Sequence, residues 1–330
     1  MKAAYIEKTG SPKNITYGDL PKPEPQGEQV LVKVGAVSVN PVDTYIRAGT
    51  IEFDLPKPYI LGCDLAGEVV AVGPEAKRFK VGDRVWGTNQ GLLGRQGTFA
   101  EFAAVDECWL YPTPENVSDE DAAAIALVGM TAHLGLFHHA NLQARETVFV
   151  HGGSGGVGSC VVQMAHAVGA RVITTGGGPE KAKVCTELGA DKVVDYKKRD
   201  VDTAIEKFAP EGINVWFETL REQDLHRVVK HLSFGGRMVL MAGRESTPEL
   251  PVGEFYVKNC SILGFAMFNS SAQQQRKSAA EINRWMSLGR VRPRIDRVMP
   301  LYEAAAAHKL QESNTLKNSG KLSGKIVLTP

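Results

Sequence analysis

Thr147–Gly169 reads TVFVHGGSGGVGSCVVQMAHAVG, which is a run of strand formers, then a cluster of glycines, then an apolar pattern. The apolar residues recur at three- and four-residue spacing and so predict a helix packed on a sheet. The glycines fit two spacings, Gly153-x-Gly155-x-x-Gly158 and Gly152-x-x-Gly155-x-x-Gly158. Either spacing allows a tight turn and brings a pyrophosphate to free N–H groups at the start of the helix. The strand before the glycines and the helix after them predict a dinucleotide-binding turn.

Composition limits the class of protein. The chain has 330 residues, enough for two domains with a core each. A net charge of +1 gives no field that would attract nucleic acid or a membrane surface. Glu7 and Lys8 interrupt the N-terminal residues before a signal-peptide core can form. The most apolar segment, residues 122–136, is broken by Gly129 and His133 and predicts a buried helix, not a membrane span. We expect a cytoplasmic protein with no nucleic-acid or membrane partner.

The five cysteines are dispersed and form no C-x-x-C pair. Such a set argues against a disulfide framework and favours a reducing cytosol. The simplest interpretation of each is a small buried hydrophobic residue. They are Cys63, Cys108, Cys160, Cys185 and Cys260.

Two kinds of pattern divide the chain. Up to about residue 120, short β runs alternate with glycine- and proline-rich turns, which predicts a compact barrel-like domain. The runs are Val30–Val34, Gly67–Val72, Arg84–Trp86 and Thr98–Ala104. Residues 87–97 are rich in glycine and lack periodicity, so we expect a mobile surface loop there.

From residue 147 onward, strands alternate with helices, which is typical of a doubly wound parallel sheet. The expected strands are Val148–His151, Arg171–Thr175, Lys192–Asp195, Val215–Glu218, Arg237–Met241 and Ile262–Ala266. The expected helices are Gly156–Val168, Pro179–Leu188, Val201–Phe208, Glu222–Leu232 and Ser271–Leu288. A last strand, Lys325–Leu328, is too close to the end to stand alone and should return to the N-terminal domain. We predict domains at 1–122 with 269–330 and at 123–268, with a cleft between them.

Further motifs occur in a fixed order along nearly the whole chain. They are Asn40-Pro-Val-Asp-Thr-Tyr-Ile-Arg-Ala-Gly49, Leu61-Gly-x-Asp-x-Ala-Gly67, Gly82-Asp-Arg-Val85, Gly97-Thr-Phe-Ala-Glu101, Gly129-Met-Thr-Ala132, Gly235-Gly-Arg237 and Ser323-Gly-Lys325. Together with the glycine turn they resemble the medium-chain dehydrogenase/reductase superfamily, most of all its zeta-crystallin-type quinone oxidoreductases. The resemblance implies an α/β fold in which a GroES-like β-barrel catalytic domain at 1–122 and 269–330 joins a doubly wound parallel Rossmann sheet at 123–268. It also implies a dimer.

The zinc alcohol dehydrogenases share this layout, but their ligands are missing here. A catalytic zinc needs three side-chain ligands and an open fourth position. Where those relatives place a cysteine and a Gly-His-Glu, this chain has Asn40 and Gly62-Cys63-Asp64. Residues 87–108, which would hold a structural zinc through four cysteines, contain only Cys108. His138 and His139 are adjacent and should point to different faces of a helix. We expect no metal site.

The second strand of the parallel sheet indicates the cofactor. An NAD-selective site usually places an acid at the end of this strand. Here the strand ends Thr174-Thr175-Gly176-Gly177-Gly178-Pro179-Glu180-Lys181, with no acid at its tip. Gly177 leaves room for a 2′-phosphate, and Lys181 can supply a positive charge to it. The alternative is that Lys181 is a solvated lysine of the first helical turn. We predict NADPH as the cofactor.

The resemblance implies the other cofactor contacts, position by position. The complete predicted set is Tyr45, Thr131, Gly152, Gly153, Ser154, Gly155, Gly156, Val157, Gly158, Gly177, Lys181, Tyr196, Leu240, Met241, Ala242, Gly243, Phe265, Ala266 and Met267. Phe265 and Met267 fit a plain core position as well as a nicotinamide contact. Tyr196 is open between packing and a contact with adenine. His151 is better explained as a satisfied core histidine than as an acid.

The expected reaction is hydride transfer from the nicotinamide to a quinone, with an α,β-unsaturated carbonyl as the alternative acceptor. No nucleophile–base pair stands out, which agrees with chemistry carried by the cofactor. Asn40 could donate a hydrogen bond to the developing oxyanion, and Tyr45 could do so or pass a proton. Asp43 and Arg47 should form a local structural pair. The rival function is a nucleotide-binding sensor or structural protein with little turnover.

Two departures from the family pattern concern the substrate pocket. After Gly49 the family commonly offers another aromatic residue, but this chain reads Thr50-Ile51-Glu52-Phe53. After the fourth parallel strand, Glu218-Thr219-Leu220-Arg221 is bulkier and more charged than the usual turn. Either change could narrow the cleft or favour an acceptor with a negative group.

The last parallel strand indicates how copies associate. Cys260–Phe268 is apolar and would leave an exposed edge on the sheet. Pairing of that edge with its copy across a two-fold axis would cover it and make a homodimer. The alternative is a monomer in which a loop covers the edge.

Overall fold

The computed structural model describes residues 1–51, 54–317 and 319–330, and the chain forms two compact units. Unit 1 comprises Met1–Leu127, Ser271–Ser287 and Arg292–Pro330, and unit 2 comprises Val128–Ser270 and Leu288–Val291. The boundaries between the units lie after residues 127 and 270, whereas the sequence predicted domain boundaries after residues 122 and 268. Glu52 and Phe53, which carry one of the two departures from the family pattern, lie outside the described residues.

Unit 1 is built on β strands. One seven-stranded sheet has the order β15-β16-β3-β5-β6-β8, with β7 also paired to β3, and a three-stranded sheet has the order β2-β1-β4. The strands are β1 (Lys2–Ile6), β2 (Thr16–Asp19), β3 (Gln29–Val39), β4 (Tyr59–Ile60), β5 (Leu65–Val72), β6 (Arg84–Gly87), β7 (Phe102–Asp106), β8 (Leu110–Pro112), β15 (Ile295–Pro300) and β16 (Lys325–Thr329).

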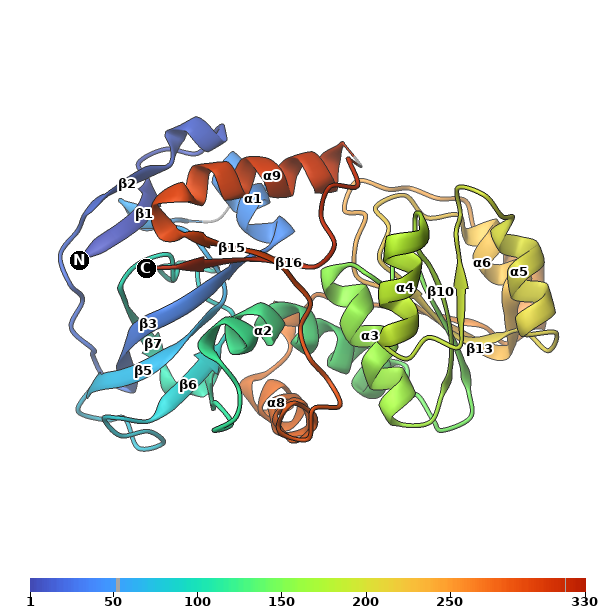
Figure 1. Ribbon diagram of the computed structural model, residues 1–330, viewed down its shortest axis with the longest axis horizontal. Helices are drawn as coiled ribbons and strands as arrows, with labels where there is room; N and C mark the ends of the chain where they lie inside the picture. Colours follow the sequence, from blue (N-terminus) through green and yellow to red (C-terminus); the bar gives the residue numbers. More distant parts are fainter. Residues whose placement is uncertain (52–53, 318) are drawn as a thin grey trace. The chain divides into compact units, whose positions relative to one another are not determined.

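Strand β3 is the long central strand of this unit. Its ladder with β5 shifts register between Leu31 and Val32 and again between Val34 and Ala36, and such bulges bend a strand. The end of the chain returns to it, because β16 pairs antiparallel with β3 and aligns Ile326 with Val39. This confirms the prediction for the last strand, and Figure 1 shows β16 beside β3.

The helices of unit 1 are α1 (Pro41–Ala48), α8 (Ala272–Ser287) and α9 (Ala304–Leu316), and α2 (Asp119–His133) begins there. α1 begins with a reciprocal capping box between Asn40 and Asp43 and ends at Gly49, whose φ is +80°. α8 follows the predicted bounds closely. α9 was not predicted, because it opens with four alanines and has no sharp apolar face; it packs on α1 and β16.

The prediction of a mobile surface loop at 87–97 is wrong for most of the segment. Gln90 and Leu92 are buried, and exposure is confined to the tip at 93–96. The Tyr59 hydroxyl donates to the Gly91 carbonyl oxygen over 2.8 Å, and Gly97 N–H donates to the Ile60 carbonyl oxygen over 3.0 Å. The glycines serve close backbone approach here: a Cβ on Gly97 would lie 2.3 Å from that same Ile60 oxygen.

Unit 2 contains a six-stranded, fully parallel sheet in the order β11-β10-β9-β12-β13-β14. The strand order reverses at β9, which confirms the doubly wound prediction. The strands are β9 (Thr147–Val150), β10 (Arg171–Thr175), β11 (Lys192–Val194), β12 (Ile213–Glu218), β13 (Leu232–Leu240) and β14 (Ser261–Gly264). The helices are α3 (Gly156–Ala167), α4 (Pro179–Glu187), α5 (Val201–Phe208), α6 (Leu225–His231) and α7 (Val252–Val257).

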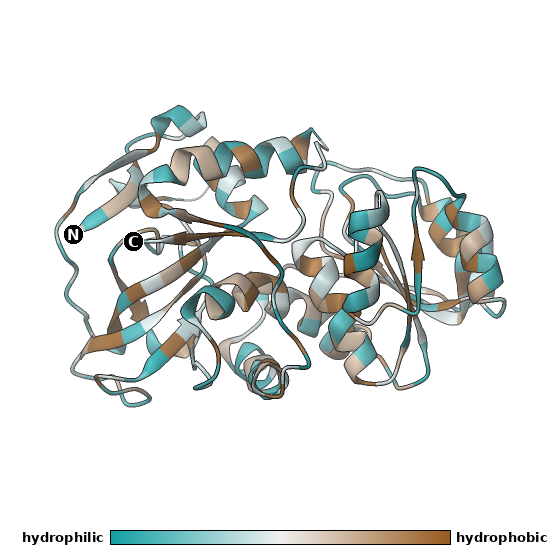
Figure 2. Ribbon diagram, viewed as in Figure 1, coloured by the Kyte–Doolittle hydropathy of each residue, from teal (hydrophilic) through white to brown (hydrophobic). Residues whose placement is uncertain are grey.

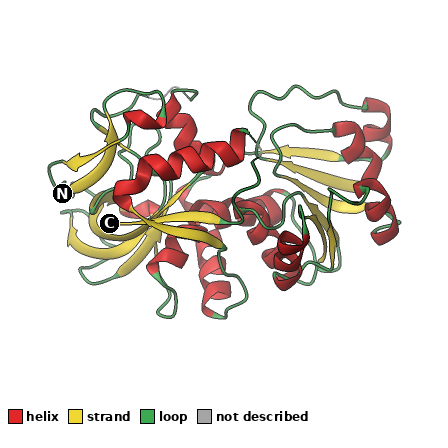
Figure 3. Cartoon of the chain, turned by 45° about the horizontal axis from the view of Figure 1, so that its top comes forward, coloured by secondary structure: helices red, strands yellow, loops and turns green. Residues whose placement is uncertain are grey.

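The core of unit 2 lies on the faces of this sheet. Phe149, Ile173 and Trp216 are fully buried and meet side chains of α5 and α6. Figure 3 shows helices on both faces of the sheet, and Figure 2 shows hydrophobic residues concentrated along its strands. Burial on two faces explains why the strands read as continuous apolar runs in the sequence.

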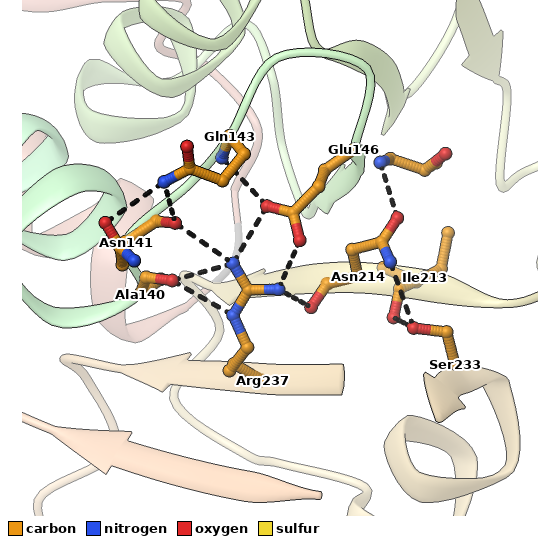
Figure 4. A network of polar contacts seen from close by, with 9 residues as sticks. Ala140, Asn141, Gln143, Glu146, Ile213, Asn214, Ser233 and Arg237 are labelled. Atoms are coloured by element: carbon orange, nitrogen blue, oxygen red, sulfur yellow. Dashed lines mark hydrogen bonds and ion pairs between the residues drawn. The ribbon is translucent and has the colours of Figure 1, made fainter. Parts of the chain in front are cut away.

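Arg237 fastens the amino-terminal side of β13 to the loop that precedes β9 (Figure 4). Its guanidinium donates to the Ala140 carbonyl oxygen over 2.7 and 3.0 Å and to both Glu146 carboxylate oxygens over 2.7 and 2.9 Å. Burial by itself raises the pKa of Glu146, but hydrogen bonds from Arg237 and Gln143 bring it below its ordinary value. The Gly235-Gly-Arg237 motif therefore has a structural role at the edge opposite the glycine turn.

One helix is long and apolar enough to cross a membrane by length and composition alone. It runs from Asp119 to His139, where α2 continues as the π-helical segment η3 (Leu134–His139). Of its apolar window, 78% is buried inside the protein. That burial is typical of a core helix, as the sequence predicted for residues 122–136.

Candidate functional site

The turn between β9 and α3 brings backbone N–H groups to the carboxyl edge of the parallel sheet. Gly152 has a φ of +62°, a conformation that favours glycine. A Cβ on Gly153 would lie 2.5 Å from Thr174 Oγ1, and one on Gly158 would lie 2.3 Å from the Gly152 carbonyl oxygen. Gly152, Gly153 and Gly158 therefore each avoid a different steric conflict in the turn. The turn thus needs glycines that belong to both spacings in the sequence.

The first turn of α3 is open to an anion. Gly155 precedes the helix, and within the described chain no side chain caps it by a hydrogen bond. The N–H groups of a first helical turn have no partner inside the helix and lie at the positive end of its dipole. The predicted residues Gly156 and Val157 lie in this turn, and Ser154 lies in the loop directly before Gly155. The turn therefore fits the pyrophosphate of a dinucleotide.

Three glycines after β10 open a space beside this turn. Gly178 has a φ of +99°. A Cβ on Gly177 would lie 2.7 Å from the Tyr196 hydroxyl oxygen, so the Tyr196 ring, which is 54% exposed, lies directly beside Gly177. Lys181 lies in the first turn of α4. The structure thus places Tyr196 against Gly177, a contact that the sequence did not predict, and leaves the tyrosine largely accessible.

An acid from the neighbouring strand supports the same loops and was missed by the sequence reasoning. Asp195 follows β11, and its Oδ1 accepts hydrogen bonds from the Gly178 N–H over 3.1 Å and from the Lys197 N–H over 3.2 Å. The only signal was its place at the end of the third parallel strand. Its carboxylate is thus bound by two backbone amides between the two loops.

His151 is a core histidine with a buried partner, as the sequence reasoning favoured. It precedes the glycine turn, and its Nδ1 lies 2.9 Å from Glu218 Oε1. Glu218 ends β12 and is 1% exposed. The charge of Glu218, which was expected to alter the acceptor pocket, is therefore buried inside unit 2. Within residues 218–221, only Arg221 carries an exposed charge.

The predicted nicotinamide contacts divide into two groups. Leu240 ends β13, and Met241, Ala242 and Gly243 follow it at the same sheet edge as the glycine turn. The second group is more interior. Thr131 and Met267 are buried, Phe265 and Ala266 are partly exposed, and the Phe265 ring lies 4.5 Å from the His139 ring.

Gln223 joins the loops after β12 and β13 and was not predicted. Its Nε2 donates to the Leu220 carbonyl oxygen over 2.7 Å and to the Ala242 carbonyl oxygen over 3.2 Å. A Cβ on Gly243 would lie 2.3 Å from this Gln223 nitrogen. Gln223 therefore ties the Leu240–Gly243 segment to the loop after β12. This contact fixes the position of the segment at the edge of the sheet where the nicotinamide end of a dinucleotide would lie.

In unit 1, the predicted pair of Asp43 and Arg47 is wrong. Asp43 Oδ2 accepts from the Asn40 N–H over 2.7 Å and so caps its own helix. Arg47 donates instead to the Gly10 carbonyl oxygen and to the Glu312 carboxylate of α9. A first-turn carboxylate satisfies the free N–H groups of the helix, which explains its preference for the cap over Arg47. Tyr45, on the same helix, is partly exposed.

A buried polar network surrounds the start of α1. Asp64 Oδ2 accepts from Asn40 Nδ2 over 2.7 Å and from Ser38 Oγ over 2.8 Å. The Lys325 ammonium donates to the Val39 carbonyl oxygen over 2.8 Å and also to Asn40 Oδ1. Lys325 is 4% exposed and Asp64 is fully buried. An ammonium and two carboxylates therefore share one interior region.

The charge of this network depends on pH. Burial raises the pKa of Asp43 to about 7, and nearby Asp64 adds to the effect, while Cys63 and Lys325 oppose it. Burial also raises the pKa of Asp64, against Lys325 and the hydrogen bond from Asn40. Desolvation disfavours a carboxylate, so both groups hold a proton more strongly than in water.

The expected oxyanion role of Asn40 does not fit this geometry. Its amide nitrogen donates to Asp64 and, over 3.4 Å, to the Ser38 carbonyl oxygen, and its amide oxygen accepts from Lys325. Asn40 is fully buried. Both hydrogens of the amide are committed inside unit 1, so Asn40 acts on the position of α1 and not on a substrate.

The residues at the zinc-ligand positions do not fit zinc. Burial raises the pKa of the Cys63 thiol well above its ordinary value, which disfavours the thiolate that a metal requires. Asp64 is occupied by Asn40 and Ser38. Across the described residues no group of three His, Cys, Asp or Glu side chains is placed to hold a metal ion. His138 and His139 do not point to different faces: their ring centroids lie 4.9 Å apart, because the π-helical turn brings them together.

Comparison with known proteins agrees with this architecture. Residues 26–115 match the alcohol dehydrogenase GroES-like domain, and residues 156–284 match the zinc-binding dehydrogenase family. The chain is 36% identical to the quinone oxidoreductase of Homo sapiens over 330 residues, which cover 99% of this chain and 97% of that protein. These matches confirm the GroES-like and Rossmann domains.

Two further similarities concern chemistry and cofactor. The chain is 31% identical to the 2-methylene-furan-3-one reductase of Solanum lycopersicum over 314 residues, which cover 93% of this chain and 73% of that protein. A solved structure of a mycobacterial protein complexed with NADPH is 27% identical, with a TM-score of 0.85 and coverage of 100% of both chains.

Proposed function

This chain belongs to the zeta-crystallin-like quinone oxidoreductases of the medium-chain dehydrogenase/reductase superfamily, and on that premise we propose that it transfers hydride from NADPH to quinones without zinc. It is an oxidoreductase with the fold of a nicotinamide-dependent enzyme. The finer statements, on NADPH, on quinones and on zinc, rest on the residues of the two units.

The observation that carries the proposal is the glycine turn beside an acid-free loop. The second parallel strand ends in three glycines, and Lys181 follows in the first turn of α4. A 2′-phosphate needs room and a positive charge, and an NAD-selective site needs an acid at that strand end. Asp195 approaches from the next strand, but two backbone amides bind its carboxylate. These features favour NADPH over NADH.

Zinc independence is supported by the donor set in unit 1. A zinc-dependent relative polarises the substrate carbonyl through the metal. Here the corresponding region holds the Lys325 ammonium between Asn40 and Val39, and the neighbouring Cys63 thiol is neutral. A conjugated acceptor such as a quinone takes up hydride without a Lewis acid, so no metal ligand is required of these residues.

The nicotinamide supplies the hydride when the cofactor is bound. The N–H groups of the first turn of α3 would hold its pyrophosphate, and Tyr196 and Lys181 would hold its adenosine end. Tyr45 would donate a hydrogen bond to the oxygen of the acceptor that gains charge. Asn40, which the sequence also proposed for this task, anchors the start of the helix that carries Tyr45.

A reductase of α,β-unsaturated carbonyls is the second candidate. It is favoured by the 31% identity to 2-methylene-furan-3-one reductase. Both acceptors are conjugated and both take hydride without a metal. Because the Glu218 carboxylate is buried against His151, Arg221 is the charge that the turn after β12 exposes, and it would favour an acceptor with a negative group.

We also propose a cytoplasmic homodimer. β14 is the last strand of the six-stranded sheet, and its residues are partly exposed or exposed. Tyr256 and Val257 precede β14, Phe234 lies on the neighbouring strand β13 beside Gly235, which donates to the Lys258 carbonyl oxygen, and each is more than 60% exposed. A second copy paired along β14 would cover these groups. Sedimentation that shows only monomer at micromolar concentration would overturn this part.

The test of the function begins with binding. The purified protein is titrated with NADPH and with NADH, and oxidation of NADPH is then followed by absorbance with 1,2-quinones, 1,4-quinones and simple enones, each with and without a chelator. Tighter NADPH binding and chelator-resistant quinone reduction are expected. Faster reduction of enones would move the assignment to the second candidate, and binding without turnover would support the sensor or structural protein.

A further inference from the structure

His151 and Glu218 form a buried pair at the centre of the parallel sheet. His151 Nδ1 lies 2.9 Å from Glu218 Oε1 and 3.1 Å from Oε2, and the two side chains are 11% and 2% exposed. A carboxylate only accepts hydrogen bonds, so the imidazole presents an Nδ1–H toward Glu218. The pair lies just beyond the point where the β9–β12 ladder ends, at Val150 and Phe217.

Glu218 is the hub of this arrangement. Besides His151, its carboxylate accepts from Trp216 Nε1 over 3.1 Å and from the Leu220 N–H over 2.8 Å. The connection is closed from the other side, because the Thr219 hydroxyl donates to the His151 carbonyl oxygen over 2.9 Å. Side chains and backbone therefore continue the pairing of β9 with β12 after the strands themselves have ended.

The position of the pair coincides with the switch point of the sheet. β10 and β11 lie on one side of β9, and β12, β13 and β14 lie on the other. In such sheets a dinucleotide binds outside the carboxyl ends of the strands at the reversal of order, with its two halves on the two sides. His151 adjoins the pyrophosphate turn, and Glu218 adjoins the loop that Gln223 fastens to Ala242.

We propose that His151 and Glu218 are a positioning pair for the cofactor, which holds the glycine turn and the loop after β12 at a fixed separation so that both halves of the dinucleotide are bound in register. The inference rests on the proposed dinucleotide function. It assigns the pair no contact with the reacting atoms. Its effect reaches the nicotinamide through the loops that the pair joins.

The surroundings argue against a pair kept only for packing. A cavity of about 120 Å³ adjoins it, and both charged and apolar side chains line it, among them Glu222, Arg227 and Val228. The pair is therefore not closely packed on this side. Buried polar pairs add little net stability compared with apolar packing, whereas they fix geometry closely.

A second pair in the same unit provides a matched control. His231 Nε2 lies 2.9 Å from Asp202 Oδ1, and the His231 side chain is 3% exposed. This pair joins α6 to α5, and the His231 ring stacks on Trp216, so its loss disturbs the core beside Glu218 without removing a hydrogen bond of the His151–Glu218 pair. His231→Gln should therefore lower the melting temperature and leave the affinity for NADPH unchanged.

Three variants test the pair itself. His151→Leu removes the donor, and Glu218→Gln leaves one amide oxygen to accept from three donors. Each should weaken NADPH binding about tenfold, because binding must then bear the cost of bringing the two loops into register. His151→Asn places an amide N–H near the position of Nδ1 and should restore most of the affinity.

The measurements are NADPH titration by fluorescence, kcat and KM for NADPH, and the isotope effect with NADPH deuterated at the transferred position, all well below the melting temperature. A misaligned nicotinamide slows hydride transfer and raises the isotope effect, whereas lost stability alone does not. The proposal fails if His151→Leu and Glu218→Gln behave like His231→Gln, with a lower melting temperature but wild-type affinity and isotope effect. If the wild-type protein binds neither NADPH nor NADH, the proposed function fails instead.

Discussion

The two units build their sites from opposite materials. In unit 1, the start of α1 is surrounded by charged side chains, namely Asp43, Asp64 and Lys325, that lie fully or almost fully inside the protein. In unit 2, the glycine turn is built from residues without side chains and presents backbone N–H groups at the start of α3. Side-chain charges respond to pH and to the loss of one partner, whereas a backbone cradle responds to added bulk. The same chain should therefore be broken in different ways in the two units.

Removal of the interior cation should have the largest effect. Lys325→Met leaves the buried Asp64 without its nearby positive charge and Asn40 Oδ1 without its donor. An uncompensated buried charge costs about 3–5 kcal/mol. We expect the free energy of unfolding, measured in urea, to fall by about that amount. Lys321→Met, at an exposed position four residues earlier, is the control and should change it by less than about 0.5 kcal/mol.

The pH dependence of stability separates two buried groups of unit 1. The pKa of Asp43 is raised by burial from 3.8 to about 7, so between those values the unfolded chain releases a proton that the folded chain keeps. Its contribution to stability falls as pH rises, by about 1.4 kcal/mol per pH unit. The pKa of His308 is lowered by burial from 6.5 to about 3, and nearby Arg47 adds to this. Its contribution falls as pH drops.

Between about pH 4 and 6.5 the contributions of Asp43 and His308 oppose each other, and the raised pKa of Asp64 adds to the slope of Asp43. Relative to wild type, Asp43→Asn should gain stability as pH rises through this range, and His308→Leu should gain stability as pH falls. Leucine strands no partner, because neither imidazole nitrogen has a hydrogen bond among the described residues. Urea unfolding at several pH values measures both. Parallel curves for the three proteins would contradict this account.

What the sequence could predict differs between the units for a physical reason. In unit 2, local periodicity predicts the strands and helices of the parallel sheet, and the residue types within Thr147–Gly169 predict the glycine turn. The network at Asn40 does not follow from such local patterns, because Lys325 lies 285 residues away and reaches it only through the pairing of β16 with β3. Both Asp64 and Lys325 belong to recognisable motifs, but a motif does not say which partner a charge will meet.

Two corrections have the same origin. Residues 87–97 have the composition of a mobile loop, yet Tyr59 and Ile60, which bind its backbone, come from β4. Asp43 and Arg47 have the spacing of a helical ion pair, but the helix N-terminus and Glu312 offer each a better partner. Local patterns predict what a segment can do alone. Contacts between distant segments then select among those options.

Added bulk should break the site of unit 2. Gly158→Ala places a Cβ 2.3 Å from the Gly152 carbonyl oxygen, so the first turn of α3 must move away from β9. Overpacking of this kind costs about 1–3 kcal/mol, and affinity for NADPH should fall at least about tenfold because the N–H groups shift with the helix. Calorimetric titration with NADPH measures it. Gly253→Ala, in α7 with nothing within 4 Å of its Cβ, should retain affinity and gain a little stability.

The smallest expected effect concerns the charge of Lys181, which we propose to contact the cofactor in unit 2. Lys181→Ala should raise the Kd for NADPH about tenfold and leave the Kd for NADH unchanged, because only NADPH carries the 2′-phosphate that we propose the Lys181 ammonium binds. Lys183→Ala is the matched control on the same helix, since Lys183 is 73% exposed and pairs loosely with Glu187 at 3.9 Å. The affinity for NADPH should also fall with added salt in wild type and less so in Lys181→Ala. Equal losses of affinity for NADPH and NADH would show that Lys181 stabilises the loop and does not bind the 2′-phosphate. The cofactor site of unit 2 would then depend on its backbone N–H groups, in contrast to the charged side chains of unit 1.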